Sequence, residues 1–507
     1  MAPVALTERY ANKIVGTLSC YDRLLLQGTL PKLCFPGGME AVLRDRGVRL
    51  VDYPRWAQQW RDALQAHAEQ LATQAGLEIE FIPKKNFRKE DKVQAVLRQR
   101  GEHPGLVWIF SALELCHRYR PWFDKAHQRW VLKPEGGKCL HYYFYFVDEE
   151  LGLCFVRLPT WCPFRFQVYL NGHHWLARKL TRRGLAYQLI DNAFVCIEDF
   201  PAAQRVADGL RAQDLHRKLD RFAARFCPIL GQLGVRYHWS IDQAEYALDI
   251  VFERAADLQP IYEQLTRTAI QAVKPPMMAT FLGKKVTGNY PAEVTNEFHT
   301  RPQGTRLKHT MGPVSIKMYD KLGRVLRIET TVNNVHYFKH YRQVEQRDGQ
   351  RPLQLAVMRK NLYSLFALQE KLRAANQRYL EFISSLEDHS AGLRRLDRFS
   401  QPVQEQQRSY AGFNFFDPED RATLEVLLRG EFNIQGVRNK ELRSHLKGTT
   451  SGQISRLLRR LRLHGIVRKV RCSYRYLLTP LGKQVLSLGL KLRQLVIIPE
   501  LAALPSG

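Results

Sequence analysis

The sequence predicts a multidomain α+β protein with mixed sheet domains, a helical middle region and a small basic domain at the C-terminus. Three observations lead to this fold class. The chain has 507 residues, enough for about three or four domains of ordinary size. Segments in which apolar residues alternate, typical of strands, are interspersed with segments of helical period. The segment 414–507 has an order of its own, in which three helices precede two strands and a last helix.

Composition favours a folded protein that binds a polyanion. Hydrophobic residues make up 45% of the chain and the formal net charge is +28. Nucleic acid suits this charge better than a membrane surface, because no segment combines a basic helical face with a bulky aromatic one. We therefore expect a nucleic-acid partner, with double-stranded DNA as the first choice and RNA as the alternative. The oligomeric state stays open.

Cysteine usage and the N-terminus indicate the compartment. The nine cysteines contain no C-x-x-C pair, which argues against a zinc knuckle and against a secreted disulfide framework. Residues 1–16 lack the apolar core of a signal peptide, and no apolar run is long enough to cross a bilayer. We expect a cytoplasmic, nucleoid-associated protein without a membrane partner.

Residues 1–200 are predicted to form an α/β or α+β domain. Its expected elements are strands at Lys13–Leu18, Leu24–Leu30, Leu77–Ile82 and Leu106–Phe110, and a helix at Trp56–Ala75. An aromatic hairpin is expected over 140–158, either as a base-stacking surface or as buried sheet. The loop 84–89 is basic with one aromatic residue inside it, a form that suits phosphate contact and base stacking. Its candidate nucleic-acid contacts are Lys84, Lys85, Arg88 and Lys89, and a solvated loop is the alternative.

The period of the apolar residues divides the middle of the chain into helical and β-rich regions. Residues 201–273 are predicted to be helical, with Tyr246, Ile250 and Val251 on one of the helices. A β-rich basic region is expected over 274–349, a long helix over 350–387 and a polar linker over 388–413. His173 and His174 are adjacent, so they do not have the i, i+4 spacing of a helical metal-binding pair.

One hairpin, Val314–Thr331, contains a candidate catalytic constellation. Asp320 and Gly323 fit its turn. Strand alternation places four side chains on one exposed face of the sheet, namely Lys317, Tyr319, Arg327 and Glu329. A tyrosine can attack a phosphodiester while cations hold the phosphate and a carboxylate holds a divalent metal.

We therefore predict Tyr319 and Glu329 as catalytic residues, with Mg²⁺ or Mn²⁺ as a cofactor only if the hairpin is catalytic. The neighbouring cations are predicted to bind nucleic acid, and these are Lys317, Lys321, Arg327, Arg306 and Lys308. The alternatives are a structural hairpin with Lys–Glu and Tyr–Arg cross-strand pairs, or a hairpin that only binds phosphate.

The C-terminal segment is the most basic part of the chain. Between residues 433 and 495 there are fifteen Lys or Arg residues and one acidic residue, Glu441. Ile454, Leu457, Leu458, Leu461 and Leu463 recur near the helical period and predict one buried face. Arg456, Arg459, Arg460 and Arg462 lie off that face and are expected to face solvent or a polyanion.

Two resemblances follow from these motifs. Ile454–Lys469, followed by Tyr476–Gly482, resembles the recognition helix and wing of bacterial winged-helix regulators. This resemblance implies a winged helix-turn-helix over 414–507, in which the four arginines with Arg468, Lys469 and Arg471 contact DNA. A basic helical bundle packed on the rest of the chain is the alternative.

The second resemblance concerns the hairpin. Lys317-x-Tyr-Asp-Lys321, followed by Leu326-Arg-Ile-Glu329, resembles the strand pair of rolling-circle replication initiators of plasmids and filamentous phages. The chain has no His-hydrophobic-His metal motif of the kind found in related initiators. The resemblance implies a protein of a bacterial mobile or plasmid-like element that recognises its own DNA and nicks or transfers a strand through the tyrosine. The alternative is a non-enzymatic binder, either a transcriptional regulator or a structured-RNA partner.

Overall fold

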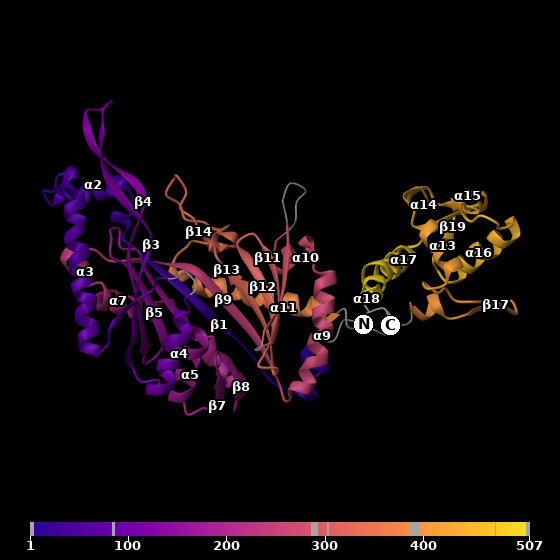
Figure 1. Ribbon diagram of the computed structural model, residues 1–507, viewed down its shortest axis with the longest axis horizontal. Helices are drawn as coiled ribbons and strands as arrows, with labels where there is room; N and C mark the ends of the chain where they lie inside the picture. The colour runs from indigo at the N-terminus through magenta and orange to yellow at the C-terminus, as the bar shows by residue number, and fades with distance from the viewer. Residues whose placement is uncertain are drawn as a thin grey trace. The chain divides into compact units, whose positions relative to one another are not determined.

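The computed structural model describes residues 5–83, 87–284, 293–301, 304–385, 396–471 and 473–502. The chain divides into two compact units, residues 1–385 (unit 1) and residues 386–507 (unit 2), shown in Figure 1. The prediction that the chain combines helices with mixed sheet is confirmed, and the structure has one large mixed sheet. Among the described helices, none has the length and apolar character needed to cross a bilayer.

Unit 1 is built on one eleven-stranded sheet with the order β10-β11-β12-β13-β9-β1-β6-β5-β4-β3-β2. Neighbouring strands are antiparallel except for the parallel pair of β2 and β3. The strands are β1 Ile14–Thr29, β2 Ile79–Phe81, β3 Gly105–Asp124, β4 Arg129–Asp148, β5 Gly152–Pro159, β6 Phe166–Asn171, β9 His238–Phe252, β10 Thr295–Arg301, β11 Gly304–Met311, β12 Val314–Lys321 and β13 Val325–Val332. Strands β3 and β4 are much longer than β5, and their hairpin extends beyond the neighbouring strands (Figure 1).

Helices cover both faces of the central strands. The longer ones are α2 Pro36–Asp45, α3 Tyr53–Ala75, α4 Lys89–Arg100, α5 Gly172–Arg182, α6 Phe200–Ala207, α7 Ala212–Phe226, α9 Ala255–Ala272 and α11 Leu365–Ser385. On one face, Asn376 of α11 accepts a hydrogen bond from Thr330 and donates one to the Tyr246 carbonyl. On the other face, His173 of α5 contacts β1 and β9, beside the small hairpin of β7 Tyr187–Ile190 and β8 Ala193–Ile197.

The predicted helix that contains Tyr246, Ile250 and Val251 is wrong, because these residues lie in β9. Strand β9 pairs with β1 on one side and β13 on the other, and all three residues are buried. A central strand that is covered on both faces carries a nearly continuous apolar run, which periodicity alone does not separate from a buried helix. The first two predicted strands, in turn, form the single strand β1.

Other predictions for unit 1 are confirmed. The helix Trp56–Ala75 lies within α3, and the hairpin Val314–Thr331 is formed by β12 and β13, with Gly323 at a φ of +68° in its turn. The aromatic hairpin over 140–158 is buried sheet, since Tyr142, Phe144 and Phe146 have almost no exposed surface.

Among its described residues, unit 2 contains a short hairpin and, after it, eight principal elements. They are β16 Val403–Glu405 and β17 Arg408–Tyr410, then α13 Pro418–Leu427, α14 Gly430–Gln435, β18 Val437–Arg438, α15 Asn439–His445, α16 Ser451–Leu463, β19 Val467–Lys469, β20 Arg475–Leu478 and α17 Pro480–Leu492. The last three strands form a sheet with the order β18-β20-β19. Its helices bury Leu442, Leu458 and Leu486 in a common core.

The predicted linker over 388–413 differs from the structure. Residues 388–395 lie outside the described residues. Residues 396–413 are folded, because they form the β16–β17 hairpin and place Phe399 and Phe413 in the core of unit 2. Two isolated phenylalanines in a polar stretch show no period, so the sequence pattern did not indicate that this segment packs.

Candidate active site and nucleic-acid interface

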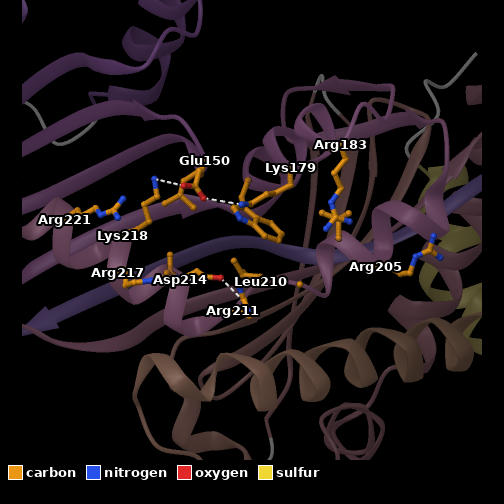
Figure 2. Close-up of a pocket in the computed structure, with 15 residues that line it drawn as sticks. Glu150, Lys179, Arg183, Arg205, Leu210, Arg211, Asp214, Arg217, Lys218 and Arg221 are labelled. Atoms are coloured by element: carbon orange, nitrogen blue, oxygen red, sulfur yellow. Dashed lines mark hydrogen bonds and ion pairs between the residues drawn. The ribbon is translucent and has the colours of Figure 1, made fainter.

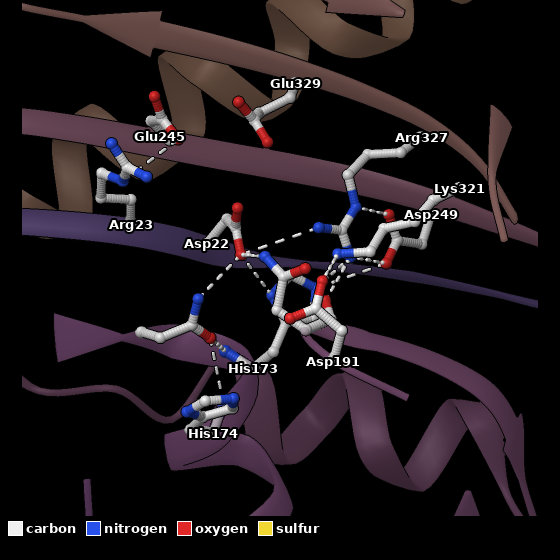
Figure 3. Close-up of polar contacts among 12 residues, drawn as sticks. Asp22, Arg23, His173, His174, Asp191, Glu245, Asp249, Lys321, Arg327 and Glu329 are labelled. Atoms are coloured by element: carbon white, nitrogen blue, oxygen red, sulfur yellow. Dashed lines mark hydrogen bonds and ion pairs between the residues drawn. The ribbon is translucent and has the colours of Figure 1, made fainter. Parts of the chain in front are cut away.

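The central strands bring eight titratable side chains together on the face opposite α11. We call this group the polar cluster, and Figure 3 shows most of it. Its members are Asp22 of β1, His173 of α5, Glu245 and Asp249 of β9, Lys317 and Tyr319 of β12, and Arg327 and Glu329 of β13. The register pairs Lys317 with Glu329 and Tyr319 with Arg327, as strand alternation predicts for residues on one face.

A β-bulge in β1 aims Asp22 into the cluster. Tyr21 lies opposite Tyr246 and Leu24 opposite Ala244, so two residues of β1 stand against Glu245 alone. A bulge of this kind bends the strand and redirects its side chains. Asp22 is buried and Arg23 stays half-exposed, with Arg23 Nε 3.8 Å from Glu245 Oε2. The bulge therefore adds both a carboxylate and a cation to the polar face.

A lysine joins two of the carboxylates. Lys317 Nζ donates to Glu329 Oε1 at 2.6 Å and to Glu245 Oε1 at 3.0 Å. Burial lowers the pKa of Lys317, but the two carboxylates outweigh this effect and raise it above the ordinary value. Lys317 is therefore an ammonium ion at neutral pH and neutralises part of the negative charge around it.

The candidate nucleophile is hydrogen-bonded to the candidate base. Tyr319 Oη donates to Glu329 Oε2 at 2.8 Å. Burial raises the pKa of Glu329 to about 7, because Lys317 offsets only part of the desolvation and other carboxylates lie nearby. Burial also raises the pKa of Tyr319 well above its ordinary value. A carboxylate that titrates near neutral pH and already accepts the phenolic hydrogen bond is suited to general-base chemistry.

The expectation of an exposed face is wrong for Glu329, which is 1% exposed, and also for Arg327. The Arg327 side chain is completely buried, and its Nε and Nη2 both donate to the carboxylate of Asp249 at 2.6 Å. Burial alone would raise the pKa of Asp249, but the Arg327 guanidinium holds it at about 2. Periodicity placed Arg327 on the correct face, but α5 and the β7–β8 turn cover that face here, with the Asn192 carbonyl accepting from Nη2 at 2.7 Å.

The start of α5 fixes the position of Asp22. Asn171 caps the helix by accepting from the backbone N–H groups of His173 and His174. Its amide also donates to Asp22 Oδ1 at 3.1 Å, and His173 Nδ1 contacts the same oxygen at 2.9 Å. His173 is thus a fully buried partner of the carboxylates.

Sequence reasoning missed Asp22, Glu245, Asp249 and His173. Glu245 and Asp249 were hidden by the incorrect helix, although both belong to the alternate positions of an apolar strand. Asp22 was hidden because a bulge breaks the alternation on which strand prediction depends. Charged residues inside apolar strands were the available signal, since such residues are rarely buried unless they are paired.

A cavity of about 550 Å³ opens beside the cluster. Its walls include Arg23, Tyr169, Asn171 and Asn192. The two asparagines both donate to Asp22 Oδ1, at 3.1 and 2.7 Å, so the cavity reaches the side chains that hold this carboxylate. A ligand with a polar group would approach the cluster from this side.

Three carboxylates of the cluster could hold a cation. Oxygen atoms of Asp22, Glu245 and Glu329 lie within 4.8 Å of one another. Carboxylate oxygens are the donors that Mg²⁺ and Mn²⁺ prefer, so the chemistry of the donor set fits a hard divalent ion. The Lys317 ammonium already neutralises two of the three, and a divalent ion would compete with it.

Two further predicted contacts lie on the same face, on β11. The register places Arg306 opposite Tyr319 and Lys308 opposite Lys317. Lys308 Nζ donates to Glu297 Oε1 of β10 at 2.9 Å, and both cations keep about a quarter of their side-chain surface exposed. The polar face therefore continues from the cluster to the sheet edge as a surface that contains cations.

The remaining predicted contacts of unit 1 are dispersed. Lys321 binds Asp191 of the β7–β8 turn at 2.9 Å. Arg88 is exposed just before α4, and Lys89 lies 4.1 Å from the ring centroid of Tyr143. Lys84 and Lys85 lie outside the described residues.

In unit 2, the structure separates the four arginines of α16. Arg456 is exposed, whereas Arg459 Nε donates to Glu405 Oε2 at 2.7 Å and Arg462 Nη2 to Glu405 Oε1 at 3.4 Å. The β16–β17 hairpin thus lies beside α16, and a hollow of about 1130 Å³ is lined by both. Arg468, Lys469 and Arg471 are exposed on and after β19.

The expectation that Arg460 faces solvent is wrong. Its guanidinium donates to both carboxylate oxygens of Asp420, at 2.7 and 2.9 Å, and to the carbonyls of Ala411 and Gly412. It also stacks 3.9 Å from the centroid of the Phe413 ring. The segment that was predicted as linker packs along α16 and uses Arg460 as its anchor.

Comparisons of this chain with protein-family models, with curated proteins and with solved structures found no match.

Proposed function

We propose that this protein recognises the DNA of a bacterial mobile or plasmid-like element and nicks or transfers one strand through Tyr319. The observation that carries the proposal is the 2.8 Å hydrogen bond from Tyr319 Oη to Glu329 Oε2. The pair lies beside an ammonium group and within reach of two further carboxylates. A nucleophile, a base and a charge-stabilising cation are the parts that tyrosine-mediated cleavage requires.

The step transfers a phosphoryl group from a sugar oxygen to the phenol. Glu329 takes the proton of Tyr319 as Oη forms a bond to phosphorus. The bond from phosphorus to one bridging sugar oxygen breaks, and that oxygen leaves with a proton from solvent. Lys317 remains protonated and stabilises the negative charge that develops on the phosphoryl oxygens. The product is a phosphotyrosine ester that another strand end or water can resolve.

A divalent ion would strengthen this chemistry. Asp22, Glu245 and Glu329 would hold Mg²⁺ or Mn²⁺. When bound, such an ion would polarise the scissile phosphate as a Lewis acid. In that state, the binding role of Lys317 would shift from the carboxylates to the phosphate.

For unit 2 we propose a winged helix-turn-helix that binds duplex DNA. The order α13, β18, α15, α16, β19, β20 supports this proposal, with α16 as the recognition helix and the β19–β20 hairpin as the wing. Arg456, Arg468, Lys469 and Arg471 are the exposed cations that would meet phosphates and base edges. Tight binding of unit 2 at one DNA sequence would then bring unit 1 to the DNA strand that it cleaves.

The decisive experiment detects a covalent protein–DNA adduct. The full chain is incubated with labelled single-stranded DNA from the nucleic acid that co-purifies with it, in Mg²⁺ or Mn²⁺, and is resolved by denaturing electrophoresis. Tyr319→Phe should abolish the adduct while binding stays intact. Glu329→Gln should slow its formation, because the base is lost but the nucleophile remains.

Tyr341→Phe is the matched control. Tyr341 belongs to β14 (Lys339–Gln343), outside the large sheet, and is 68% exposed. Its substitution should leave the adduct unchanged. An adduct that persists in Tyr319→Phe and disappears in Tyr341→Phe would move the active site to β14.

One observation favours a non-enzymatic alternative. Lys317 and Arg327 together hydrogen-bond three of the four carboxylates of the cluster, and Arg327 Nη1 lies 3.7 Å from the fourth, Asp22, as expected for a buried network that holds four strands together. In that case the chain binds nucleic acid as a transcriptional regulator or structured-RNA partner. Binding without cleavage on any co-purified nucleic acid would support this alternative.

A further inference from the structure

A second basic site lies in unit 1, away from the polar cluster. Helices α5, α6 and α7 and the turn between β4 and β5 surround a groove of about 640 Å³ (Figure 2). We call it the α5–α7 groove. Seven of its lining side chains are Lys or Arg, and two are acidic, Glu150 and Asp214. The lining carries a net positive charge and so favours an anionic ligand.

Several of the cations already have carboxylate partners. Lys179 Nζ donates to Glu150 Oε2 at 3.2 Å, and Lys218 Nζ lies 3.2 Å from Glu150 Oε1. Arg211 and Arg217 both pair with Asp214. These pairs hold the side chains in place and leave excess positive charge.

Three arginines of the groove supply that excess. Arg183 follows α5, Arg205 lies on α6 and Arg221 on α7, and all three are exposed. Within the described part of the chain, none of the three has an ion pair closer than 4 Å. In Figure 2, Arg221, Lys218, Lys179 and Arg183 follow one another in one row, Arg217 and Arg211 form a second row below it, and Arg205 lies to the right of both. Two rows of cations suit an extended polyanion better than a single compact anion.

The lining between these rows is partly apolar. Trp175 and Leu215 contribute to it, with 7% and 2% of their surface exposed, together with the half-buried Leu210. Grooves that bind single-stranded nucleic acid combine cations along the backbone with apolar or aromatic surface for the bases.

One helix joins this groove to the polar cluster. At its start, Asn171 and His173 contact Asp22, and further along Trp175 and Lys179 line the groove. Helix α5 has 11 residues, which corresponds to a length of about 16 Å at 1.5 Å per residue. A few nucleotides of an extended strand cover that distance.

We propose that the α5–α7 groove binds the single-stranded segment that flanks the scissile phosphate, through its phosphate groups. This proposal rests on the proposed function, because only a protein that cleaves DNA has a scissile phosphate. The strand-binding property of the groove is tested without any cleavage, so the two can fail separately.

The experiment measures the affinity of the full chain for a fluorescein-labelled oligothymidine by fluorescence anisotropy, without divalent ions, over a range of salt concentrations. The test variant is R183A/R205A/R221A. The matched control is R44A/R55A/R267A, which removes the same charge from exposed arginines of α2, α3 and α9. Urea denaturation verifies that both variants are folded.

The groove variant should bind the strand more weakly than the control and with a shallower salt dependence. Each lost phosphate contact lowers the slope of log K against log salt by about 0.7 on a single strand, so three lost contacts lower it by about 2. Equal affinities and slopes in the two triple variants would overturn the proposal, whatever the outcome of the adduct experiment.

Competition identifies the source of the phosphate. Unlabelled oligothymidine should displace the probe, whereas ATP and inorganic pyrophosphate at the same phosphate concentration should not, because each spans only a part of the two rows of cations. Displacement by ATP or pyrophosphate as efficient as that by the oligonucleotide would assign the groove to a free nucleotide or phosphate and would overturn the single-strand proposal.

Discussion

The hairpin face of Lys317, Tyr319, Arg327 and Glu329 in unit 1 and the arginine face of α16 in unit 2 were both predicted to be exposed, and the structure differs between them. Arg327 has no exposed surface and a bidentate aspartate partner. Arg456 is exposed, and no hydrogen bond or ion pair is found for its side chain among the described residues. Periodicity predicts the face on which a side chain lies in both regions. It does not predict whether another layer covers that face. The presence of such a layer decides whether a cation stabilises the fold or stays available to a partner.

The largest expected effect of this difference is on stability. Arg327→Ala removes the partner of Asp249 and leaves a buried carboxylate unpaired, which should lower the free energy of unfolding by about 3–5 kcal/mol. Arg456→Ala changes only exposed surface and should stay within about 0.5 kcal/mol of wild type. Urea denaturation of the two variants measures the difference. Similar unfolding midpoints would mean that Arg327 is not part of a structural pair.

The second expected effect is on the pH dependence of adduct formation, which Glu329 should control and the permanently charged arginines should not. Adduct formation needs Glu329 as a carboxylate, and its pKa is raised to about 7 by burial. Below that value the group is mostly protonated and inactive, so the rate should rise about tenfold per pH unit and level off above about pH 7. The rate of adduct formation, measured from quenched samples at a series of pH values, gives this profile.

In Glu329→Gln the rise near pH 7 should be absent, and the remaining rate should be low at every pH. A wild-type rate that keeps rising well above pH 8 would indicate that direct ionisation of Tyr319, and not Glu329, limits the reaction.

The sequence predicted local elements well and the burial of charge poorly. The β12–β13 hairpin, its turn at Gly323 and the shared face of Tyr319 and Glu329 all follow from alternation over eight-residue strands. Strand β9 could not be predicted in the same way, because its apolar residues are continuous and its neighbours β1 and β13 are distant in sequence. The carboxylates of Asp22 and Glu245 reach the cluster only through those long-range pairings.

The third prediction compares two arginines one helical turn apart on α16. Arg460 anchors Asp420 and the backbone of residues 411 and 412, so Arg460→Ala should destabilise unit 2 by about 1–3 kcal/mol. Arg456→Ala should leave unit 2 stable, weaken duplex binding and lower the salt slope by about 1. Thermal unfolding and anisotropy on duplex DNA measure the two properties. If Arg456→Ala leaves duplex affinity and its salt dependence unchanged, α16 is not the recognition helix.

The smallest expected effect tests whether the β16–β17 hairpin restrains the arginines that remain on α16. Glu405 binds Arg459 and Arg462, which are 39% and 46% exposed, and so competes with phosphate for both. Glu405→Gln keeps the size of the side chain and removes its charge, which should tighten duplex binding. Exposed pairs are worth about 0.2–1 kcal/mol each, so the expected gain in Kd is about 1.4- to fivefold for each pair that is released.

Glu431→Gln is the control for that variant, because it removes the same charge from an exposed residue of α14 that pairs with Arg429. The change in net charge alone affects both variants equally, so only a larger gain in Glu405→Gln supports release of Arg459 and Arg462. That gain should also steepen the salt dependence, since two freed guanidinium groups add phosphate contacts and counterion release. Equal gains in the two variants would show that the hairpin does not restrain α16. In that case the ion pairs with Glu405 would not limit phosphate binding by Arg459 and Arg462, and these two residues would be as available to phosphate as Arg456.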